Sequence, residues 1–422
     1  MVYDRNESFL GHVHRHPAKI WFRHSADESG ALVKVEAKVI LDGGAYASTT
    51  SAVLANACCF SVGPYRVPNA LIEGWGVRTN NPPCGAMRGF GNVQTCFAAE
   101  AQMDKLAKAL SLDPVEFRLL NALETGDILI TGQEITGTAP VKEVLTSLAQ
   151  YPLPEPTEGD LLDLPGGTGR TTDKSHVKRG VGYAASIKNL MFSEGFDDFS
   201  EARCIVTDGK VLIKSACVEV GQGFVTLVGQ IVEETLGISD VTILPVDTSI
   251  GSAGSTSASR QTWMSGGAVL KACEAVVDAL LLDLSSENGV AYDKSGLNLV
   301  SKDGSHSIDI SAALRGRNYD EHVTHRHKRT FPLDHNGQGN AHVSFAFAAH
   351  RAVVDVDEEL GLVRVVEIAT SQDVGRVLNP VQARGQIEGG IAQGLGLALL
   401  EELVLDDGKI VNANFTCLLY TS

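Results

Sequence analysis

Four clusters of glycine, serine and other turn-forming residues, each directly before a segment with helical periodicity, constrain this chain more than any other feature. They occupy residues 85–91, 221–223, 251–260 and 384–390. Glycine allows a close approach of the backbone, and a helix N-terminus presents unpaired N–H groups at the positive end of its dipole. Such junctions bind phosphate or other oxyanions. One cluster alone is typical of a tight turn, whereas four together favour one large phosphate-bearing ligand held by several loops.

The charge of the chain limits the ligands that it attracts. Its 35 Lys and Arg residues and 51 Asp and Glu residues give a net charge of −16. A chain so acidic repels nucleic acid and anionic membrane surfaces, so we expect no partner of either kind. Neutral backbone N–H groups are the natural donors to an anion in such a protein. The 43 glycines among 422 residues exceed the usual share of about seven per cent.

The common nucleotide-binding motifs do not occur in this sequence. Residues 394–399 lack the third glycine of the dinucleotide fingerprint and lie inside a helical pattern, and there is no Gly-x-x-x-x-Gly-Lys-Ser/Thr. We therefore expect neither a Rossmann nor a P-loop site. There is also no run of 18 apolar residues and no signal-peptide layout at the N-terminus, which predicts a cytoplasmic location.

Cysteines and histidines give no strong metal pattern. The eight cysteines include no Cys-x-x-Cys, and their apolar or small neighbours predict buried free thiols. Histidines gather at residues 12–16 and 322–327, and strand alternation places His12, His14 and His16 on one side. The first group has no acidic or cysteine neighbour, and the second lies in a basic polar segment. We predict solvated surface histidines in both groups and no protein ligand to a metal.

Helical and strand patterns alternate without a strict βαβ rhythm, which predicts an α+β fold with mixed sheets. Residues 285–340 are polar and predict an exposed excursion. In the first long helix, Phe97, Ala101, Leu106 and Leu110 are expected on one face. The predicted strands are 31–41, a pair around the 208–209 turn, 342–356 and 362–370, and the predicted helices are 93–110, 114–120, 224–236, 260–284 and 383–403.

Proline and glycine concentrate in residues 151–175, which we predict to be a linker. This boundary divides the chain into a first domain at residues 1–150 and a second at residues 176–422.

Several short motifs together resemble one family, the molybdenum-binding subunits of the xanthine dehydrogenase and aldehyde oxidase group. The first half of the chain is most similar to bacterial purine-catabolic xanthine dehydrogenases. The resemblance implies two elongated mixed-sheet molybdopterin-binding domains. The motifs follow the family order and are residues 15–17 (RHP), 43–46 (GGAY), 63–69 (GPYRVPN), 79–83 (TNNPP), 86–91 (AMRGFG), 220–223 (VGQG), 385–389 (GQIEG) and 393–396 (QGLG).

The resemblance also implies a cofactor and partners. The cofactor is molybdenum bound by the dithiolene of a pterin, in bacteria usually as the cytosine dinucleotide, with no protein ligand to the metal. Electrons leave through 2Fe-2S and FAD groups on an iron–sulfur subunit and an FAD subunit, so a hetero-oligomer is implied. The parent enzyme is expected to hydroxylate a purine such as xanthine or hypoxanthine, with water as the oxygen source. The substrate is expected to be a small N-heterocycle.

Site residues are implied by position in the matching motifs. Gly221, Gln222 and Gly223 match the loop beside molybdenum and pterin. The turn of Ser257, Ala258 and Ser259 matches a pterin contact, and Gln386 matches a glutamine that hydrogen-bonds the pterin. Arg88, the implied catalytic residue and a cofactor contact, belongs to a turn whose backbone approaches the metal. Phe90, in the same turn, is implied to stack on an aromatic substrate.

Two positions depart from the family pattern. Gly89 follows Arg88 where carbon monoxide dehydrogenases of the superfamily have cysteine, which argues against that activity. Asn56 stands where xanthine-oxidising members often have an arginine that grips the purine oxygen, and its amide forms hydrogen bonds without bringing charge. An aldehyde or nicotinate hydroxylase is therefore an alternative, with Asn56 and Phe90 as the expected substrate-binding residues.

Parts of the family pattern lie outside this sequence. A glutamine and a Gly-Phe-Gly-Gly loop belong upstream, and the general-base glutamate belongs downstream. Residues 417–422 do not resemble the family and look non-native. We expect a fragment that is inactive alone, or one that acts only as a module binding the cofactor or a partner.

Overall fold

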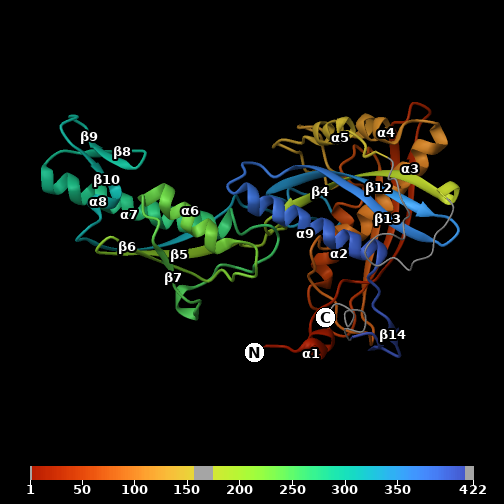
Figure 1. Ribbon diagram of the computed structural model, residues 1–422, viewed down its shortest axis with the longest axis horizontal. Helices are drawn as coiled ribbons and strands as arrows, with labels where there is room; N and C mark the ends of the chain where they lie inside the picture. Colours follow the sequence, from red (N-terminus) through yellow and green to blue (C-terminus); the bar gives the residue numbers. More distant parts are fainter. Residues whose placement is uncertain (1, 156–173, 414–422) are drawn as a thin grey trace.

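The computed structural model describes residues 2–155 and 174–413, and Figure 1 shows them as two lobes at opposite ends of the long axis. The large lobe comprises residues 2–155, 177–190 and 344–413. The small lobe comprises residues 199–326. Each lobe combines helices with sheets in which parallel and antiparallel pairs both occur, so the α+β expectation is confirmed.

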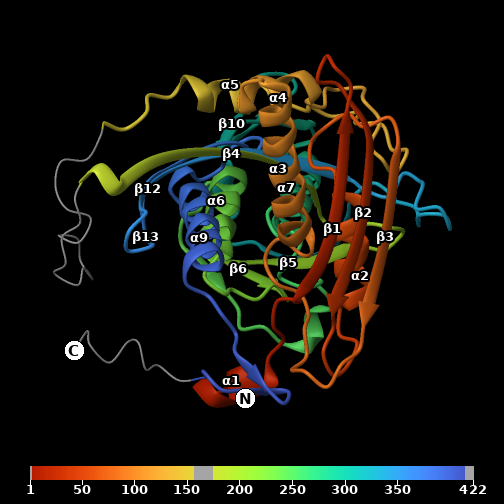
Figure 2. The ribbon, with the colours of Figure 1, turned by 90° about the vertical axis from the view of Figure 1, so that its right-hand side faces the viewer.

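The first sheet of the large lobe has strand order β1-β2-β3, with β2 antiparallel to β1 and parallel to β3. Alternate apolar residues of β2, among them Val35, Val39 and Leu41, are buried, as the period of two predicts. Figure 2 shows this sheet along one side of the lobe, with α3 beside it. The elements are α1 (Arg5–Gly11), β1 (Ala18–Ala26), β2 (Leu32–Asp42), α2 (Thr50–Cys59), β3 (Ala70–Val77), α3 (Asn92–Leu110), α4 (Pro114–Asn121) and α5 (Val141–Gln150).

A second sheet of the large lobe has β12 between β4 and β13, antiparallel to both. Its strands are β4 (Val177–Leu190), β12 (Ser344–Asp357) and β13 (Leu362–Asp373). Ile187 and Phe347 of this sheet share one hydrophobic core with Phe60, Met103 and Phe117. The core thus joins residues from both sides of the predicted linker, of which 156–173 lie outside the described residues. The domain boundary stays a prediction.

The small lobe has a four-stranded sheet of order β11-β5-β6-β7, covered by α6 and α7. Most of residues 285–340 are exposed or half-buried, as the sequence predicted, but their regular structure was not foreseen. They form a small sheet and then strand β11, which pairs with β5 along nine residues and so covers an otherwise open edge. The elements are β5 (Phe199–Thr207), β6 (Lys210–Ser215), α6 (Phe224–Leu236), β7 (Val241–Ile243), α7 (Met264–Asn288), β8 (Tyr292–Ser295), β9 (Asn298–Ser301), β10 (Ser307–Asp309), α8 (Ile310–Ala313) and β11 (Asn318–Arg326).

Helix α3 buries a different face from the one predicted. Its buried stripe is Thr95, Ala99, Met103 and Ala107, spaced four residues apart, whereas Phe97 is 81% exposed. Small side chains allow the helix to lie close to β1, while Leu106 and Leu110 of the predicted face are partly buried against the core. The prediction had followed side-chain size.

Two short hydrogen-bonded strands, β14 (Leu405–Asp406) and β15 (Lys409–Ile410), follow helix α9 (Pro380–Leu399), which has no buried residue. Within residues 2–155 and 174–413, no helix is long and apolar enough to cross a membrane. The free-thiol prediction holds for the described cysteines, of which Cys59, Cys204 and Cys273 are among the buried ones. Residues 417–422 lie outside the described residues.

Candidate functional site

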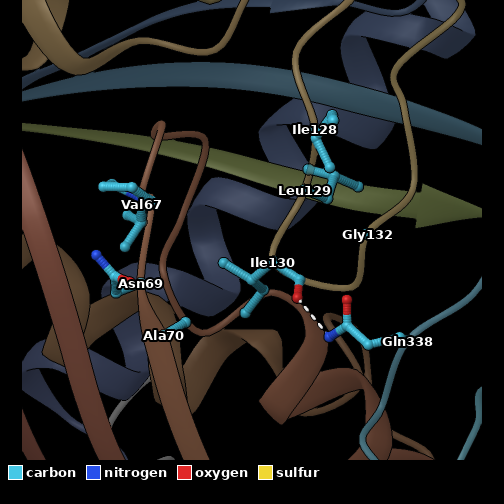
Figure 3. Close-up of a pocket in the computed structure, with 9 residues that line it drawn as sticks. Val67, Asn69, Ala70, Ile128, Leu129, Ile130, Gly132 and Gln338 are labelled. Atoms are coloured by element: carbon cyan, nitrogen blue, oxygen red, sulfur yellow. Dashed lines mark hydrogen bonds between the residues drawn. The ribbon is translucent and has the colours of Figure 1, made fainter.

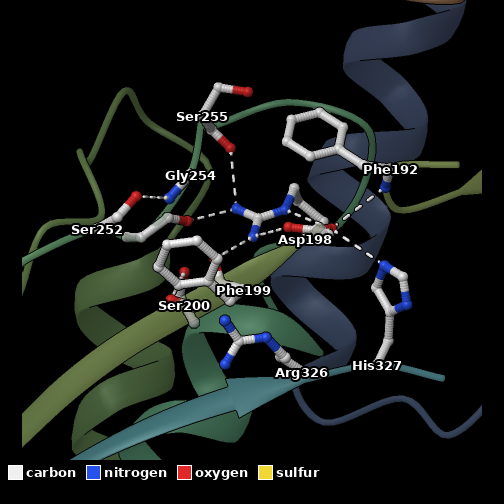
Figure 4. Close-up of polar contacts among 12 residues, drawn as sticks. Phe192, Asp198, Phe199, Ser200, Ser252, Gly254, Ser255, Arg326 and His327 are labelled. Carbon is white, nitrogen blue, oxygen red and sulfur yellow. Dashed lines mark hydrogen bonds and ion pairs between the residues drawn. The ribbon is translucent and has the colours of Figure 1, made fainter. Parts of the chain in front are cut away.

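The serine loop, residues 251–260, is shaped by the buried side chain of Arg260. Its guanidinium donates to the carbonyl oxygens of Ala253 and Ser255 and pairs with the buried Asp198 carboxylate, with Nε 3.1 Å from Oδ2. Figure 4 shows Asp198 and Ser255 on opposite sides of this cluster. Because the loop's inward carbonyls are bound, the following turn, residues 257–259, lies at the surface.

That outward turn has an unusual backbone. Ala258 has φ 56° and Ser259 has φ 48°, in the left-handed region that side chains other than glycine seldom adopt. Such conformations persist only where the surroundings impose them, and they concentrate at ligand-binding sites. The Ser255 and Ser257 hydroxyl oxygens are 2.6 Å apart, and residues 257–259 are exposed. The predicted pterin-contacting residues therefore form an accessible turn with two serine hydroxyl groups.

The glycine turn, residues 221–223, already holds an anion from its own chain. Glu219 Oε1 accepts hydrogen bonds from the N–H groups of Gly221 at 2.7 Å and Gly223 at 3.1 Å, directly before α6. Partial burial alone would raise the pKa of Glu219, but these backbone donors outweigh it and lower that pKa. The Gln222 side chain folds back, and its Oε1 accepts a hydrogen bond from the N–H of Val220. The turn has anion-binding geometry, although the two glycine N–H groups point inward.

The Arg88 turn, residues 85–91, is packed against helix α9. Arg88 Nη2 donates to the carbonyl oxygen of Gln386 at 2.6 Å, and a Cβ at Gly389 would lie 3.3 Å from Arg88 Nη1. Glycine at 389 therefore leaves room for the guanidinium. Phe90, with φ 46°, is half-buried against a small core that includes Val53. The predicted stacking role of Phe90 stays a prediction.

Further contacts join the Arg88 turn, α9, the glycine turn and the serine loop into a ring. A Cβ at Gly223 would meet the amide of Gln382 on α9 at 2.5 Å. Thr256 Oγ1 donates to the carbonyl of Val218, which links the serine loop to the glycine turn.

Strand β4 closes the ring on its other side. Met191 N–H, directly after β4, donates to the carbonyl of Ala258 at 2.8 Å. Asn92 Nδ2, directly after the Arg88 turn, donates to the carbonyl of Ile187 at 2.7 Å.

Three of the four clusters, residues 85–91, 221–223 and 251–260, are loops before helices as predicted. Residues 384–390 instead lie inside α9, because the Asn379 cap and the proline after it start this helix earlier. Three loops and one helix that are far apart in the sequence are thus brought together.

Asn56, the predicted substrate residue, is buried on α2, and its Oδ1 accepts a 2.5 Å hydrogen bond from Lys188 Nζ. Sequence reasoning missed Lys188. The sequence feature that could have identified it is a single positively charged residue among the apolar and small residues 181–190 at the end of β4.

The histidine prediction was wrong for three side chains. His16 is buried, and its Nε2 lies 2.9 Å from Thr50 Oγ1. His325 is buried, and His327 lies 3.5 Å from the Asp198 carboxylate with 4% of its side chain exposed. These histidines point inward because their strand or turn packs against the core. The described residues contain no group of three or more His, Cys, Asp or Glu that could hold a metal ion.

A separate pocket of about 480 Å³ contains none of the predicted site residues. Figure 3 shows that it lies between the start of β3 and the loop around Ile130. Its polar side chains are Asn69 and Gln338, whose amides donate to the backbone carbonyls of Val33 and Ile130. With no titratable side chain lining it, this pocket offers no acid, base or nucleophile.

Comparison with known proteins shows the family of this chain. Molybdopterin cofactor-binding domain models match residues 167–420 and 1–122. The chain belongs to the molybdenum-binding subunits of the xanthine dehydrogenase and aldehyde oxidase family. A probable xanthine dehydrogenase subunit from Bacillus subtilis is 31% identical and covers 97% of this chain and 54% of the relative. The nicotine 6-hydroxylase large subunit of Paenarthrobacter nicotinovorans is 27% identical, over 98% of this chain and 52% of that protein.

Solved structures of the family share the fold. Aldehyde oxidoreductase from Desulfovibrio gigas superposes with a TM-score of 0.75 and 26% identity, over 97% of this chain and 42% of that one. The chain thus spans about half the length of the curated relatives it matches.

The residues of the ring fit a molybdopterin cofactor. The serine turn, residues 257–259 of the serine loop, offers exposed hydroxyl groups, and α9 offers the exposed Gln386 amide. These groups are suited to hydrogen bonds with a polar ring system or a phosphate. A Cβ at Gly221 would meet nothing within 4 Å, so the surface beside this glycine is open to a ligand. Gly221 and Gly223 already show that this turn binds a carboxylate.

Proposed function

We propose that this chain supplies the cofactor-cradling part of a molybdenum hydroxylase that oxidatively hydroxylates a purine, xanthine or hypoxanthine, with water as the oxygen source. The closed ring of contacts between the Arg88 turn, α9, the glycine turn and the serine loop carries this proposal. The cofactor, when bound, supplies the redox chemistry, and the protein binds, orients and polarises.

The residues of this chain divide that work. In the proposal, Ser257, Ala258, Ser259 and Gln386 hold the pterin, together with the glycine turn. Arg88 fixes the spacing between its own turn and α9 through the Gln386 carbonyl. Asn56, buried in the second half of α2, faces the substrate in this proposal.

The form of the cofactor and the partners belong to the same proposal. We take the cofactor to be the cytosine dinucleotide form, and the partners to be an iron–sulfur subunit with 2Fe-2S groups and an FAD subunit in a cytoplasmic hetero-oligomer. The name of the nicotine 6-hydroxylase relative, a large subunit, supports an assembly of several chains.

A nicotinate-type substrate is the second candidate. The nicotinate dehydrogenase large molybdopterin subunit of Eubacterium barkeri is 41% identical over 145 residues, which is 34% of this chain. The neutral Asn56 amide also suits a ring without a purine oxygen. Aldehyde oxidation and an inactive cofactor-binding or partner-binding fragment are the remaining alternatives.

One experiment tests these proposals together. The complex containing this chain is purified, its molybdenum and its cytosine nucleotide are quantified, and turnover of xanthine, hypoxanthine, nicotinate and benzaldehyde is compared. We expect bound cofactor and fastest turnover of the purines. Arg88→Ala should lower cofactor content, whereas Arg23→Ala, at an exposed arginine on β1, should not. Bound molybdenum without purine turnover would contradict the proposed substrate.

A further inference from the structure

Lys188 is a partly enclosed cation near the end of β4 whose hydrogen bonds go to neutral groups. Its Nζ donates to Asn56 Oδ1 at 2.5 Å and to Asn189 Oδ1, and both asparagines are 5% exposed. The ammonium lies 5.6 Å from the centre of the Phe60 ring. An ammonium has three N–H donors, so two of the three are used within the described chain.

No carboxylate forms an ion pair with Lys188 in the described part of the chain. Burial lowers the pKa of Lys188 to about 8, although Cys59 and Glu194 act in the opposite direction. Burial also raises the pKa of Glu194. A cation that is taken out of water without a close counter-charge is costly, so such a residue is retained for a function more often than for stability.

A second polar group beside Lys188 has no partner. His342 is 2% exposed, and neither of its ring nitrogens has a hydrogen-bond partner in the described residues. Its ring lies 5.0 Å from the Phe60 ring, and Gln133 holds its backbone through two hydrogen bonds. Burial and the Lys188 charge lower the pKa of His342 to about 4. Unpartnered polar atoms in such a setting indicate a polar ligand.

The position of Lys188 connects this cluster to the cofactor ring. Ile187, one residue before it, accepts the hydrogen bond from Asn92 after the Arg88 turn. Met191, three residues after it, donates to Ala258 of the serine turn. Lys188 therefore lies on the segment of β4 that joins the two turns.

We propose that Lys188 determines substrate specificity by donating to a carbonyl or anionic oxygen attached to the heteroaromatic ring, while Asn56 and Asn189 orient its ammonium. The inference rests on the proposed function and adds to it a residue and a substrate class, rings that bear an exocyclic oxygen. Asn56 acts as a positioning residue in this arrangement, and Lys188 on β4 supplies the positive charge.

Hypoxanthine and purine are a matched pair of probes, because hypoxanthine carries an exocyclic oxygen at C6 and purine has none. In the holoenzyme, Lys188→Met should weaken hypoxanthine binding about 10- to 100-fold, as expected for one hydrogen bond to a charged donor. Purine binding should change less than about twofold. Calorimetry on the chemically reduced holoenzyme, which cannot oxidise the probe, measures binding without turnover. In the oxidising assay the KM for hypoxanthine should rise more than kcat falls. Lys188→Arg should restore part of the binding.

Lys178→Met is the matched control, since Lys178 is an exposed lysine on the same strand. It should leave both affinities unchanged. The melting temperature of Lys188→Met should stay close to that of the wild type, because the substitution removes a poorly compensated cation but leaves two buried amide oxygens without a donor.

The outcomes separate the inference from the proposed function. If the holoenzyme oxidises purine and hypoxanthine and Lys188→Met binds both as the wild type does, the inference is wrong and the proposed function stands. Equal losses for both probes would also overturn it. If the molybdenum-loaded enzyme oxidises no N-heterocycle, the proposed function fails and the inference falls with it.

Discussion

The two lobes each contain a completely buried arginine paired with a buried carboxylate, but the two pairs hold different things. In the large lobe, Arg118 Nε lies 2.8 Å from Glu100 Oε2. Glu100 also accepts from the Tyr65 hydroxyl at 2.7 Å and from Ala185 N–H at 3.1 Å. This carboxylate therefore ties together α3, the Tyr65 segment and β4, all of which pack in one hydrophobic core.

In the small lobe, Arg260 pairs with Asp198 and gives its other donors to the carbonyls of Ala253, Ser255 and Phe199. Only two residues of the serine loop, Ala253 and Arg260, are buried, so apolar packing contributes little to its shape. A buried pair of an arginine and a carboxylate thus supports a core in one lobe and a predicted ligand-binding loop in the other. The comparison predicts that damage to the first lowers stability and damage to the second lowers cofactor binding.

The largest effect is expected at Arg118. Arg118→Met leaves the Glu100 carboxylate buried without its cation and should cost about 3–5 kcal/mol of unfolding free energy. Burial already raises the pKa of Glu100 despite this arginine. Urea unfolding measures the loss. Arg66→Met, at a half-exposed pair with Glu124, should cost less than about 1 kcal/mol. The double variant Arg118→Met/Glu100→Gln, which keeps an oxygen acceptor for Tyr65 and Ala185, should recover part of the stability, and no recovery would contradict an electrostatic cause.

Acid should weaken the large lobe through two buried histidines, His24 on β1 and His342 just before β12. Burial lowers the pKa of His24 to about 4, and burial together with the Lys188 charge lowers that of His342 to about 4. Between pH 6.5 and 4 the unfolded chain binds these protons and the folded chain does not, so stability falls as the pH drops. The loss is about 3 kcal/mol per histidine, at 1.36 kcal/mol per pKa unit. The unfolding free energy, measured between pH 7 and 4, should fall less with decreasing pH in His342→Gln than in the wild type. His306→Gln, at an exposed site in the small lobe, should match the wild type.

Arg260→Lys tests the small lobe without removing charge. An ammonium cannot reach the Asp198 carboxylate and three carbonyls in the same fork geometry, so the serine loop should lose its fixed shape. We expect about 1–2 kcal/mol of lost stability, the value of one or two hydrogen bonds, and a tenfold or greater fall in bound molybdenum. Arg118→Lys is the matched comparison and should retain more cofactor per folded protein. Equal cofactor loss in both variants would break the contrast between the lobes.

The sequence predicted those features that repeat or that depend on local chemistry. Helix α6 was expected at residues 224–236 and begins at Phe224 and ends at Leu236. Helix α4 was expected at residues 114–120 and begins at Pro114, where the Asp113 side chain caps it. Three turn clusters were recognised because glycine and serine mark helix starts independently of the tertiary fold, whereas residues 384–390 proved to be part of α9.

What the sequence could not predict depends on partners that are distant along the chain. Strand β11 looked like a polar loop because its pairing with β5 is set by residues more than a hundred positions away. Lys188 attracted no attention for the same reason, since its partner Asn56 lies 132 positions earlier. Helix α3 buries its small residues because β1 lies close to it, and no pattern within the helix gives that distance.

The smallest expected effect concerns Glu219, which binds the glycine turn as Arg260 binds the serine loop. Glu219→Gln keeps an oxygen acceptor and removes the charge, so the turn before α6 should lose about 1 kcal/mol, the difference between a charged and a neutral hydrogen bond. Glu359→Gln, on an exposed turn of the large lobe, serves as the control and should not change the melting temperature. Bound molybdenum should not decrease in Glu219→Gln, because a weaker internal acceptor leaves the Gly221 and Gly223 N–H groups more available to an anionic ligand. A loss of cofactor as large as that in Arg260→Lys would instead mean that Glu219 gives the glycine turn its binding shape, and that both loops of the small lobe depend equally on a charged side chain of this chain.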